Sequence, residues 1–175
     1  MIETARLRLR PLEPRDRDAM IAMFADPAVM ENLAPVKSPA ETDATMTRHQ
    51  GYRPTHGLGF WVVEKDGEAI GHCGLKPGAP NTPIEDELEI GWIVARAHWR
   101  RGYALEAAQA SLDWAWCNRV ESRVVAVTAE RNTASRAMMV RLGMRHLPEL
   151  DFDHPSFADD PGRQRTVVYA IDRPA

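Results

Sequence analysis

The chain has 175 residues, of which 44% are hydrophobic and 27% are charged, and its formal net charge is -3. This length suits about one domain with its own hydrophobic core, so we expect residues 1–175 to form a single domain. The balanced composition excludes a disordered chain, a collagen-like repeat and a coiled coil. The slightly acidic charge gives no overall field that would draw the protein onto nucleic acid or an anionic membrane.

The sequence contains no candidate membrane segment and little cysteine. Its first residues are charged and lack the apolar core of a signal peptide, and no stretch approaches the roughly 20 apolar residues that span a bilayer. Cys73 and Cys117 are too few for a disulfide framework, and we expect both to be buried small hydrophobes. These features predict a cytoplasmic protein.

The first half of the chain predicts strands and two helices. Alternation over 6–12 predicts a half-buried strand, and apolar residues at helical spacing predict a short helix over 16–25. A capping serine before proline, with glutamate three residues later, predicts a polar surface helix from 39 towards 52. Aromatic and β-branched runs over 59–64 and 68–75 flank an Asp-Gly turn and predict a hairpin.

The second half predicts alternating strands and helices, so the fold class is α+β (mixed α/β) with one sheet. Three prolines and a glycine predict a loop over 76–83, two prolines predict a polar loop over 151–164, and Gly143 is placed to end a helix in a left-handed cap. The predicted elements are a loop over 76–83, strands over 85–94 and 124–127, helices over 102–117 and 132–142, a strand over 144–150, a polar loop over 151–164 and a last strand over 165–171.

The strand over 85–94 carries two carboxylates on one face. Side chains alternate across a strand, so Glu87 and Glu89 share a face with Gly91 and Ile93. Either carboxylate can serve as a general base if that face borders a substrate cleft, and both are solvated side chains if it is open to water.

The turn that precedes the helix over 102–117 has the features of an anion site. It reads Trp-Arg-Arg-Gly-Tyr-Ala over 99–104, which places free backbone N–H groups and two arginines at a helix N-terminus. This pattern favours phosphate binding, although an ordinary helix start on a basic surface has the same residues. It lacks the Gly-Lys-Ser/Thr of a P-loop and the three glycines of a dinucleotide fingerprint. The six histidines show no metal-ligand spacing, so we predict no metal site.

Three motifs together resemble the GNAT superfamily of N-acyltransferases. They are Glu-Ile-Gly-Trp over 89–92, the turn over 99–107, and the helix that runs from Asn132-Thr-Ala-Ser to Leu-Gly-Met over 142–144. Their order and spacing are those of the RimJ/RimL-like branch, named for ribosomal-protein N-terminal acetyltransferases, which also begins with a segment similar to 4–10. The resemblance covers nearly the whole chain.

The resemblance implies the fold and the cofactor. A GNAT fold has one mostly antiparallel sheet, splayed between its fourth and fifth strands and flanked by about four helices, with acetyl-CoA as co-substrate in the cleft. Backbone groups of Ile93 and Val94 would then pair with the pantetheine amides. The remaining residues implied in cofactor binding are Arg100, Arg101, Gly102, Tyr103 and Ala104 around the pyrophosphate, and Asn132 as a helix cap near the cofactor.

The resemblance also implies catalytic roles. Glu89 would take the amine proton, with Glu87 as second choice, and the backbone near Val94 would donate to the carbonyl oxygen. Many family members place a tyrosine beside the leaving thiolate, whereas this chain has Met139 there. Ser135 matches the Asn-x-x-Ser of the branch and would stabilise the thiolate in its place.

Several alternatives remain open at this level. The acceptor amine can be a protein N-terminus or a small molecule, and the missing tyrosine leaves room for a non-catalytic acyl-CoA sensor. The acidic segment over 151–162 could border the amine site and attract cations. Phe60, Trp61 and Trp92 could line an acceptor pocket or belong to the core. Edge pairing through the final hairpin would give a homodimer.

Overall fold

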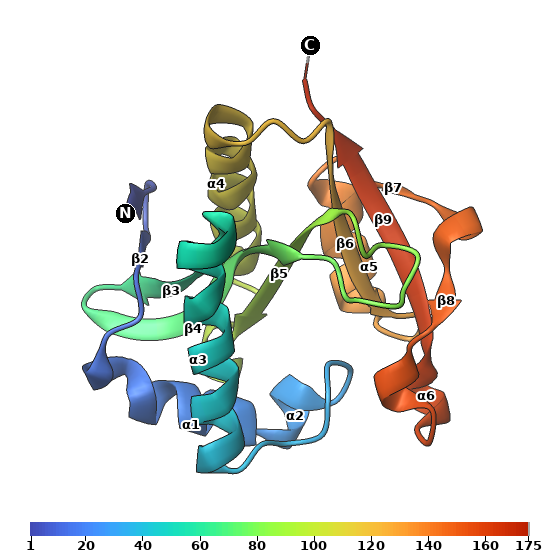
Figure 1. Cartoon of the computed structure of the whole chain (residues 1–175). Helices are drawn as coiled ribbons and strands as arrows, with labels where there is room; N and C mark the ends of the chain where they lie inside the picture. The colour runs from blue at the N-terminus through green and yellow to red at the C-terminus, as the bar shows by residue number, and fades with distance from the viewer. Residues whose placement is uncertain (175) are drawn as a thin grey trace.

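A computed structural model describes residues 1–174, and one sheet runs through them (Figure 1). Its strand order is β1-β2-β3-β4-β5-β6-β9-β7, and β8 also pairs with β9. The strands are β1 (Ile2–Glu3), β2 (Arg8–Arg10), β3 (Gly59–Lys65), β4 (Glu68–Pro77), β5 (Leu88–Val94), β6 (Arg123–Ala129), β7 (Arg145–His146), β8 (Phe152–Asp153) and β9 (Arg165–Asp172). The expectation of a mixed α/β fold with one mostly antiparallel sheet is confirmed.

The helices follow the predicted capping signals closely. The α-helices are α1 (Arg17–Ala25), α2 (Pro27–Met30), α3 (Pro39–His56), α4 (Tyr103–Asn118), α5 (Thr133–Arg141) and α6 (Pro161–Gln164). Ser38 and Glu41 form the predicted capping box at the start of α3, which continues to a left-handed Gly57. Asn132 caps α5 as expected, and Gly143 is left-handed behind it.

The predicted hairpin of β3 and β4 is confirmed, and a glycine lets the two strands approach each other closely. A Cβ added to Gly74 would lie 2.3 Å from the carbonyl oxygen of Gly59 on β3. Strand β5 begins at Leu88, later than expected, because the segment before it turns back towards β4, where the Gly78 N–H donates to the Glu87 carbonyl. Five β4 residues opposite β5, Gly71 to Leu75, are buried.

Strands β5 and β6 are parallel neighbours that separate almost at once. Their register contains only two pairs, Leu88 with Val124 and Glu89 with Val125. Beyond these pairs, β5 stays bonded to β4 as far as Val94, and β6 stays bonded to β9 as far as Ala129. The sheet therefore opens between the two strands, which are the fourth and fifth of the predicted order.

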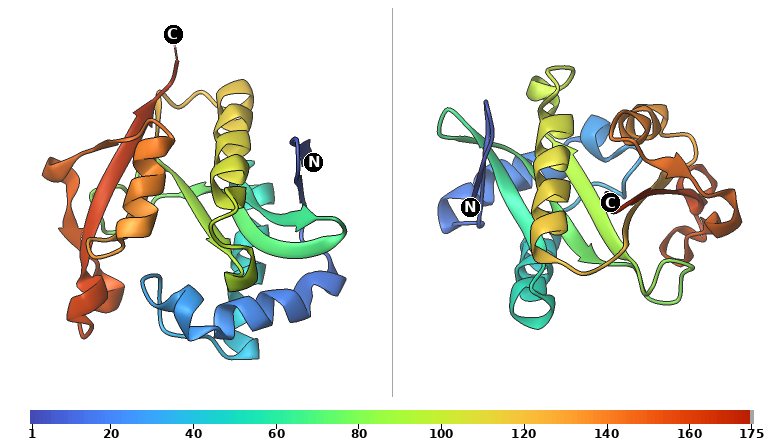
Figure 2. Two further views of the ribbon diagram at one scale, coloured as in Figure 1. Left: turned by 180° about the vertical axis from the view of Figure 1, so that it is seen from behind. Right: turned by 90° about the horizontal axis from the view of Figure 1, so that it is seen from above.

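Helices cover both faces of the sheet. Figures 1 and 2 show α3, with α1 and α2 below it, on one face, and α4 and α5 on the other. On the α4 face, Ala108 and Leu112 pack against Leu75 and Ile90, whereas on the α3 face Ile93 joins a methionine-rich cluster that includes Met20. Across residues 1–174, no helix is both long and apolar enough for a bilayer span.

The C-terminal third differs from the sequence expectation. The strand expected over 144–150 is limited to Arg145–His146 in β7, because 3-10 helix η3 (Pro148–Leu150) follows it directly. The segment expected to be a loop over 151–164 holds β8, 3-10 helix η4 (Pro155–Phe157) and α6. Strand β9 is not at the edge of the sheet, because it lies between β6 and β7.

The two cysteines have different environments. Cys73 is buried as expected, and burial raises the pKa of its thiol to about 12. Cys117 is exposed near the end of α4, so the expectation that it is buried was wrong. The helical pattern placed it at the helix end, where the chain turns away from the sheet.

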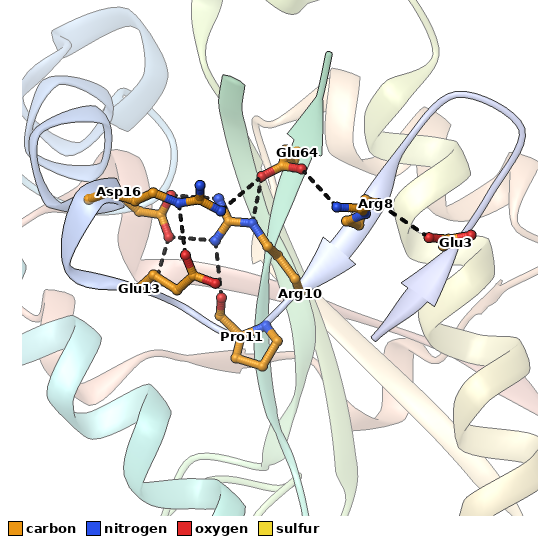
Figure 3. A network of polar contacts seen from close by, with 8 residues as sticks. Glu3, Arg8, Arg10, Pro11, Glu13, Asp16 and Glu64 are labelled. Carbon is orange, nitrogen blue, oxygen red and sulfur yellow. Dashed lines mark hydrogen bonds and ion pairs between the residues drawn. The ribbon is translucent and has the colours of Figure 1, made fainter. Parts of the chain in front are cut away.

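A buried arginine joins β2 to β3 and to the turn before α1 (Figure 3). The Arg10 guanidinium donates to both carboxylate oxygens of Asp16 at 2.7 Å, and its Nε donates to Glu64 on β3 at 2.6 Å. The Glu13 N–H also donates to Asp16. Burial alone would raise the pKa of Asp16, but the hydrogen bonds from Arg10 and Glu13 lower it below its ordinary value.

Asp16→Asn should therefore remove acid-sensitive stability. At pH 7 we expect the free energy of unfolding to fall by about 2 kcal/mol, because a charged hydrogen-bond partner is lost. A carboxylate with a lowered folded pKa stabilises above its unfolded pKa, roughly 3.9, and loses this contribution as pH falls through the folded value. The difference between the two proteins should accordingly shrink in acid.

Urea unfolding across the acid range measures this difference. Asp18→Asn, which changes a side chain 97% exposed on α1, is the matched control and should leave the curve unchanged. An Asp16→Asn curve that runs parallel to the wild type into strong acid would contradict the role assigned to Asp16.

Candidate active site

The opening between β5 and β6 leads into a cleft of about 360 Å³. Residues Glu89 to Ile93 of β5 form one wall, and Val127 to Ala129 of β6 form the other. The start of α5 contributes Ser135, and α3 contributes His49. The cleft therefore reaches from the split in the sheet to the helices of the α3 face.

The hydrogen-bond parity of β5 determines which backbone groups face the opening. The Ala95 N–H donates to the Ile70 carbonyl, and the Gly78 N–H donates to the Glu87 carbonyl. In an antiparallel sheet, every second residue of a strand bonds to the same neighbouring strand. The peptide groups of Ile93 therefore bond to β4, opposite His72. The peptide groups of Trp92 and Val94 point to the other side, where β6 has already diverged.

This parity corrects one expectation. Ile93 was expected to offer its backbone to an extended ligand, but its peptide groups are used by the β4 ladder, and only its side chain lines the cleft. Trp92 takes its place beside Val94. The register of β5 against β4 decides which peptide groups are bonded, and sequence periodicity does not determine this register.

The turn before α4 has the backbone conformation expected of an anion cradle. Arg100 and Gly102 are both left-handed, with φ of 60° and 80°, and Tyr103 begins the helix. Arg100 and Arg101 are exposed, whereas Tyr103 is buried and Ala104 is half-buried. Consecutive N–H groups at a helix N-terminus with arginines beside them fit a phosphate group.

Trp99 connects this turn to the end of β5. Its indole N–H donates to the Val94 carbonyl at 2.7 Å, although the residue is 43% exposed. The Val94 carbonyl is thereby satisfied, and its N–H is left pointing into the opening. The sequence indicated Trp99 only as part of the turn, so this positioning contact was missed.

The N-terminal segment braces the same turn from outside. Arg6 binds Glu106 in the first turn of α4 at 2.6 Å, and its guanidinium donates to the Arg101 carbonyl at 3.0 Å. The Thr4 hydroxyl also donates to Glu106. Burial opposes ionisation, but these hydrogen bonds lower the pKa of Glu106, so the carboxylate remains charged and structural.

Glu89 lies inside the cleft and Glu87 does not. Glu89 is 6% exposed, and Lys76, directly opposite on β4, forms an ion pair with it. Burial raises the pKa of Glu89, and Lys76 partly offsets this rise. Glu87 precedes β5 and pairs with Arg123 of β6. The two carboxylates were predicted to share a face, but only Glu89 lines the cleft.

Three aromatic rings form the floor of the cleft beside Glu89. Phe60 stacks on His49 with ring centroids 4.3 Å apart and lies 4.8 Å from His72. A Cβ on Gly91 would approach Phe60 to 3.1 Å, so this glycine leaves room for the ring. Burial lowers the pKa of His49 to about 2 and of His72 to about 3, and both rings are therefore neutral.

At the start of α5, Asn132 has a structural role, whereas Ser135 has a free hydroxyl. The Asn132 side chain accepts from the Ser135 N–H and donates to Thr128 on β6, so both ends of its amide are used in the cap. Ser135 is half-buried and lines the cleft with its hydroxyl available. Met139 is buried in the core and offers no proton donor.

The far wall of the cleft is basic and aromatic, in contrast to the acidic rim expected. His154, Phe157 and Arg163 line it, whereas Asp151 accepts from the Val168 N–H and pairs with His146. Asp160 pairs with Arg163. The expectation of a negative rim was wrong because these carboxylates hold the segment together. Of the candidate aromatics, Phe60 and Trp92 line the cleft, and Trp61 packs on Trp114.

Comparisons with known proteins agree with this geometry. The family model of the Acetyltransferase (GNAT) domain matches residues 6–145. The uncharacterized protein YkkB of Bacillus subtilis is 34% identical over 82% of this chain and 84% of its own. The FsC-acetyl coenzyme A-N(2)-transacetylase of Aspergillus fumigatus is 30% identical over 98% of this chain and 76% of its own.

Solved structures share the fold over almost the whole chain. An acetyltransferase from Agrobacterium tumefaciens has a TM-score of 0.80 and 28% identity, covering 97% of this chain and 92% of its own. RimL, a ribosomal L7/L12 alpha-N-protein acetyltransferase in complex with coenzyme A, has a TM-score of 0.79 and 16% identity over 97% and 95%. A spermidine N-acetyltransferase from Vibrio cholerae, in complex with CoA and spermine, has a TM-score of 0.75 and 18% identity, covering 97% of this chain and 97% of its own.

A sheet split between two parallel strands, together with these matches, identifies an acyl-CoA-dependent transferase. The chain belongs to the GNAT acetyltransferase family. It is an N-acetyltransferase that uses acetyl-CoA as co-substrate, which favours an enzyme over the non-catalytic sensor.

The position of Lys76 yields a direct test of the site's electrostatics. Lys76→Met should raise the pKa of Glu89 further, because the nearby cation that favours the carboxylate is removed while burial remains. The carboxyl ¹³C resonance of Glu89, followed by NMR through a pH titration, measures this. Lys76→Arg should keep a pKa close to that of the wild type. No upward movement in Lys76→Met would mean that the ion pair does not form in solution.

Proposed function

We propose that the enzyme transfers acetyl from acetyl-CoA directly to a primary amine while both substrates are bound. The observation that carries this proposal is the buried Glu89 carboxylate at the point where β5 and β6 separate. It stands next to backbone groups that no neighbouring strand uses. A base and an oxyanion donor are what attack of an amine on a thioester requires.

Each atom transferred has an assigned partner in this scheme. The amine nitrogen attacks the thioester carbon, and its proton passes through water to Glu89. The Val94 N–H donates to the carbonyl oxygen as negative charge develops there. The C–S bond then breaks, and the Ser135 hydroxyl donates a hydrogen bond to the departing thiolate. Glu87 has no role because Arg123 holds it outside the cleft.

The proposed cofactor site runs along the other side of the split. The N–H groups from Arg101 to Ala104 hold the pyrophosphate, and Arg100 and Arg101 add positive charge around it. The peptide groups of Trp92 pair with the pantetheine amides, which leaves the Val94 N–H for the thioester carbonyl oxygen. Asn132 contributes by holding α5, and therefore Ser135, against β6.

The proposal extends to the setting of the enzyme. Residues 1–175 act as one acetyltransferase domain in a reducing cytoplasm, which is supported by the single sheet and by two cysteines without a disulfide. A homodimer built by edge pairing would use the two-residue edge strands β1 and β7, which offer little ladder for it.

Glu89→Gln tests the proposed base. We expect kcat to fall by roughly 100-fold, because proton transfer to a positioned side chain contributes about that much or more. The affinity for acetyl-CoA should be unchanged, since Gln keeps the size of the side chain. Thiol release with an amine panel and calorimetry with acetyl-CoA measure the two quantities. Glu87→Gln is the matched control, and full turnover by Glu89→Gln would remove Glu89 from the mechanism.

Gly102→Glu tests the proposed cradle. The new side chain would meet a backbone with φ of 80° and place negative charge where the pyrophosphate lies, so we expect acetyl-CoA binding to be abolished. Gly143→Glu is the matched control, because its φ is 83° and it lies behind α5. Binding by calorimetry that is lost equally in both variants would point to backbone strain and not to the cradle.

A further inference from the structure

The side chains that line the cleft carry an excess of positive charge. Among the described residues that line the cleft, Glu89 is the sole carboxylate, against four cationic side chains. Two of these four already have partners, since Lys76 binds Glu89 and Arg163 binds Asp160. The cationic lining residues are Lys37, Arg48, Lys76 and Arg163.

Lys37 and Arg48 are the two that remain unpaired. Within residues 1–174, neither has a carboxylate oxygen within 4.0 Å. Lys37 lies just before α3 and is half-buried. Its backbone N–H donates to the Phe24 carbonyl, which fixes its position. Arg48 lies on α3 at the rim of the same cleft. A half-buried cation without a partner favours an anion from outside.

A neutral histidine of the cleft, His49, lies close to these two cations. Lys37, Arg48 and Lys76 all lie near enough to His49 to repel a proton from its ring. The Nδ1 atom of His49 is buried and has no hydrogen-bond partner among the described residues. The cleft thus offers a carboxylate at one point and cations plus a free ring nitrogen at another.

The opposite wall provides no site for a second ammonium group. No carboxylate of the 151–162 segment lines the cleft, and Asp151 binds His146 and the Val168 N–H while Asp153 faces Arg165. His154 and Phe157 occupy the wall instead. A polycationic acceptor would therefore place its distal charges against Lys37, Arg48 and Arg163.

We propose, resting on the acetyl transfer described above, that the acceptor is a small amine that also carries an anionic group. Its amine faces Glu89, and Lys37 and Arg48 bind its anion. A cleft of about 360 Å³ suits such a small molecule. Charge complementarity selects amino acids or amino phosphonates over neutral amines and over diamines.

A matched series of acceptors tests the proposal. The probes are ω-amino acids of increasing chain length, each with the alkylamine and the diamine of equal length, and thiol release gives kcat/KM for each. At the best length we expect the amino acid to exceed both partners by about tenfold, as one charged hydrogen bond supplies. Amino phosphonates in parallel distinguish phosphate-like from carboxylate recognition. Equal use of the three amines, or preference for the diamine, would overturn the proposal.

Two variants locate the anion site. Lys37→Met and Arg48→Met should bring the ratio of kcat/KM between amino acid and alkylamine close to one, mainly through a higher KM for the amino acid. Arg141→Met is the control, because Arg141 is exposed on α5 and does not line the cleft, and it should keep the ratio of the wild type. An unchanged ratio in both cleft variants would contradict the assignment.

Equilibrium binding separates this inference from the proposed function. Calorimetry of the same acceptors with the CoA-bound protein reports acceptor preference without turnover. Selective binding of the amino acid with no thiol release would sustain the anion site and defeat the proposed transfer step. Thiol release that strongly favours peptides with neutral N-terminal residues over every small amino acid would sustain transfer and defeat the anion site.

Discussion

The divergence of β5 from β6 is the constraint on which the site depends. Each strand is held by its outer neighbour, β5 by β4 and β6 by β9, so neither can turn to close the gap without losing hydrogen bonds that are already made. Only two residue pairs connect them. The peptide groups beyond those pairs are therefore available to an extended ligand, and Glu89 stands at the last pair.

Ionic contacts far apart in the sequence keep this opening in position. Arg10 joins β2, β3 and the turn before α1, whereas Arg6 joins the N-terminal segment to the first turn of α4. Trp99 connects the turn before α4 to the end of β5. The proposed cradle, the proposed carbonyl-binding N–H and the proposed base are thus held by elements that pack independently of any ligand, which is the pre-organisation that catalysis requires.

Local signals predicted most of the elements, and long-range pairing explains what they missed. The capping box at Ser38 and the Asp-Gly turn at 66–67 act over a few residues, so their outcomes followed from the sequence. Ile93 was misassigned because hydrogen-bond parity depends on register with β4. The acidic segment was misread because Asp151 and Asp160 have partners that composition does not reveal.

The same distinction applies within the site. Glu89 and the Gly102 turn were identified from spacing and family resemblance, since both lie in short motifs. Lys76, His49 and Lys37 come from three separate elements and converge only through tertiary packing of α3 on the sheet. No pattern in the sequence marks them as neighbours of Glu89.

Residue-resolved amide hydrogen exchange, with and without coenzyme A, tests the central claim most directly. The N–H groups of Trp92, Val94 and Ala129 face the opening, whereas that of Ile93 is bonded to β4. Binding of coenzyme A should slow exchange at the first group of amides and leave Ile93 as slow as before. Coenzyme A that binds without protecting Trp92 and Val94 would show that the split between β5 and β6 is not the cofactor site.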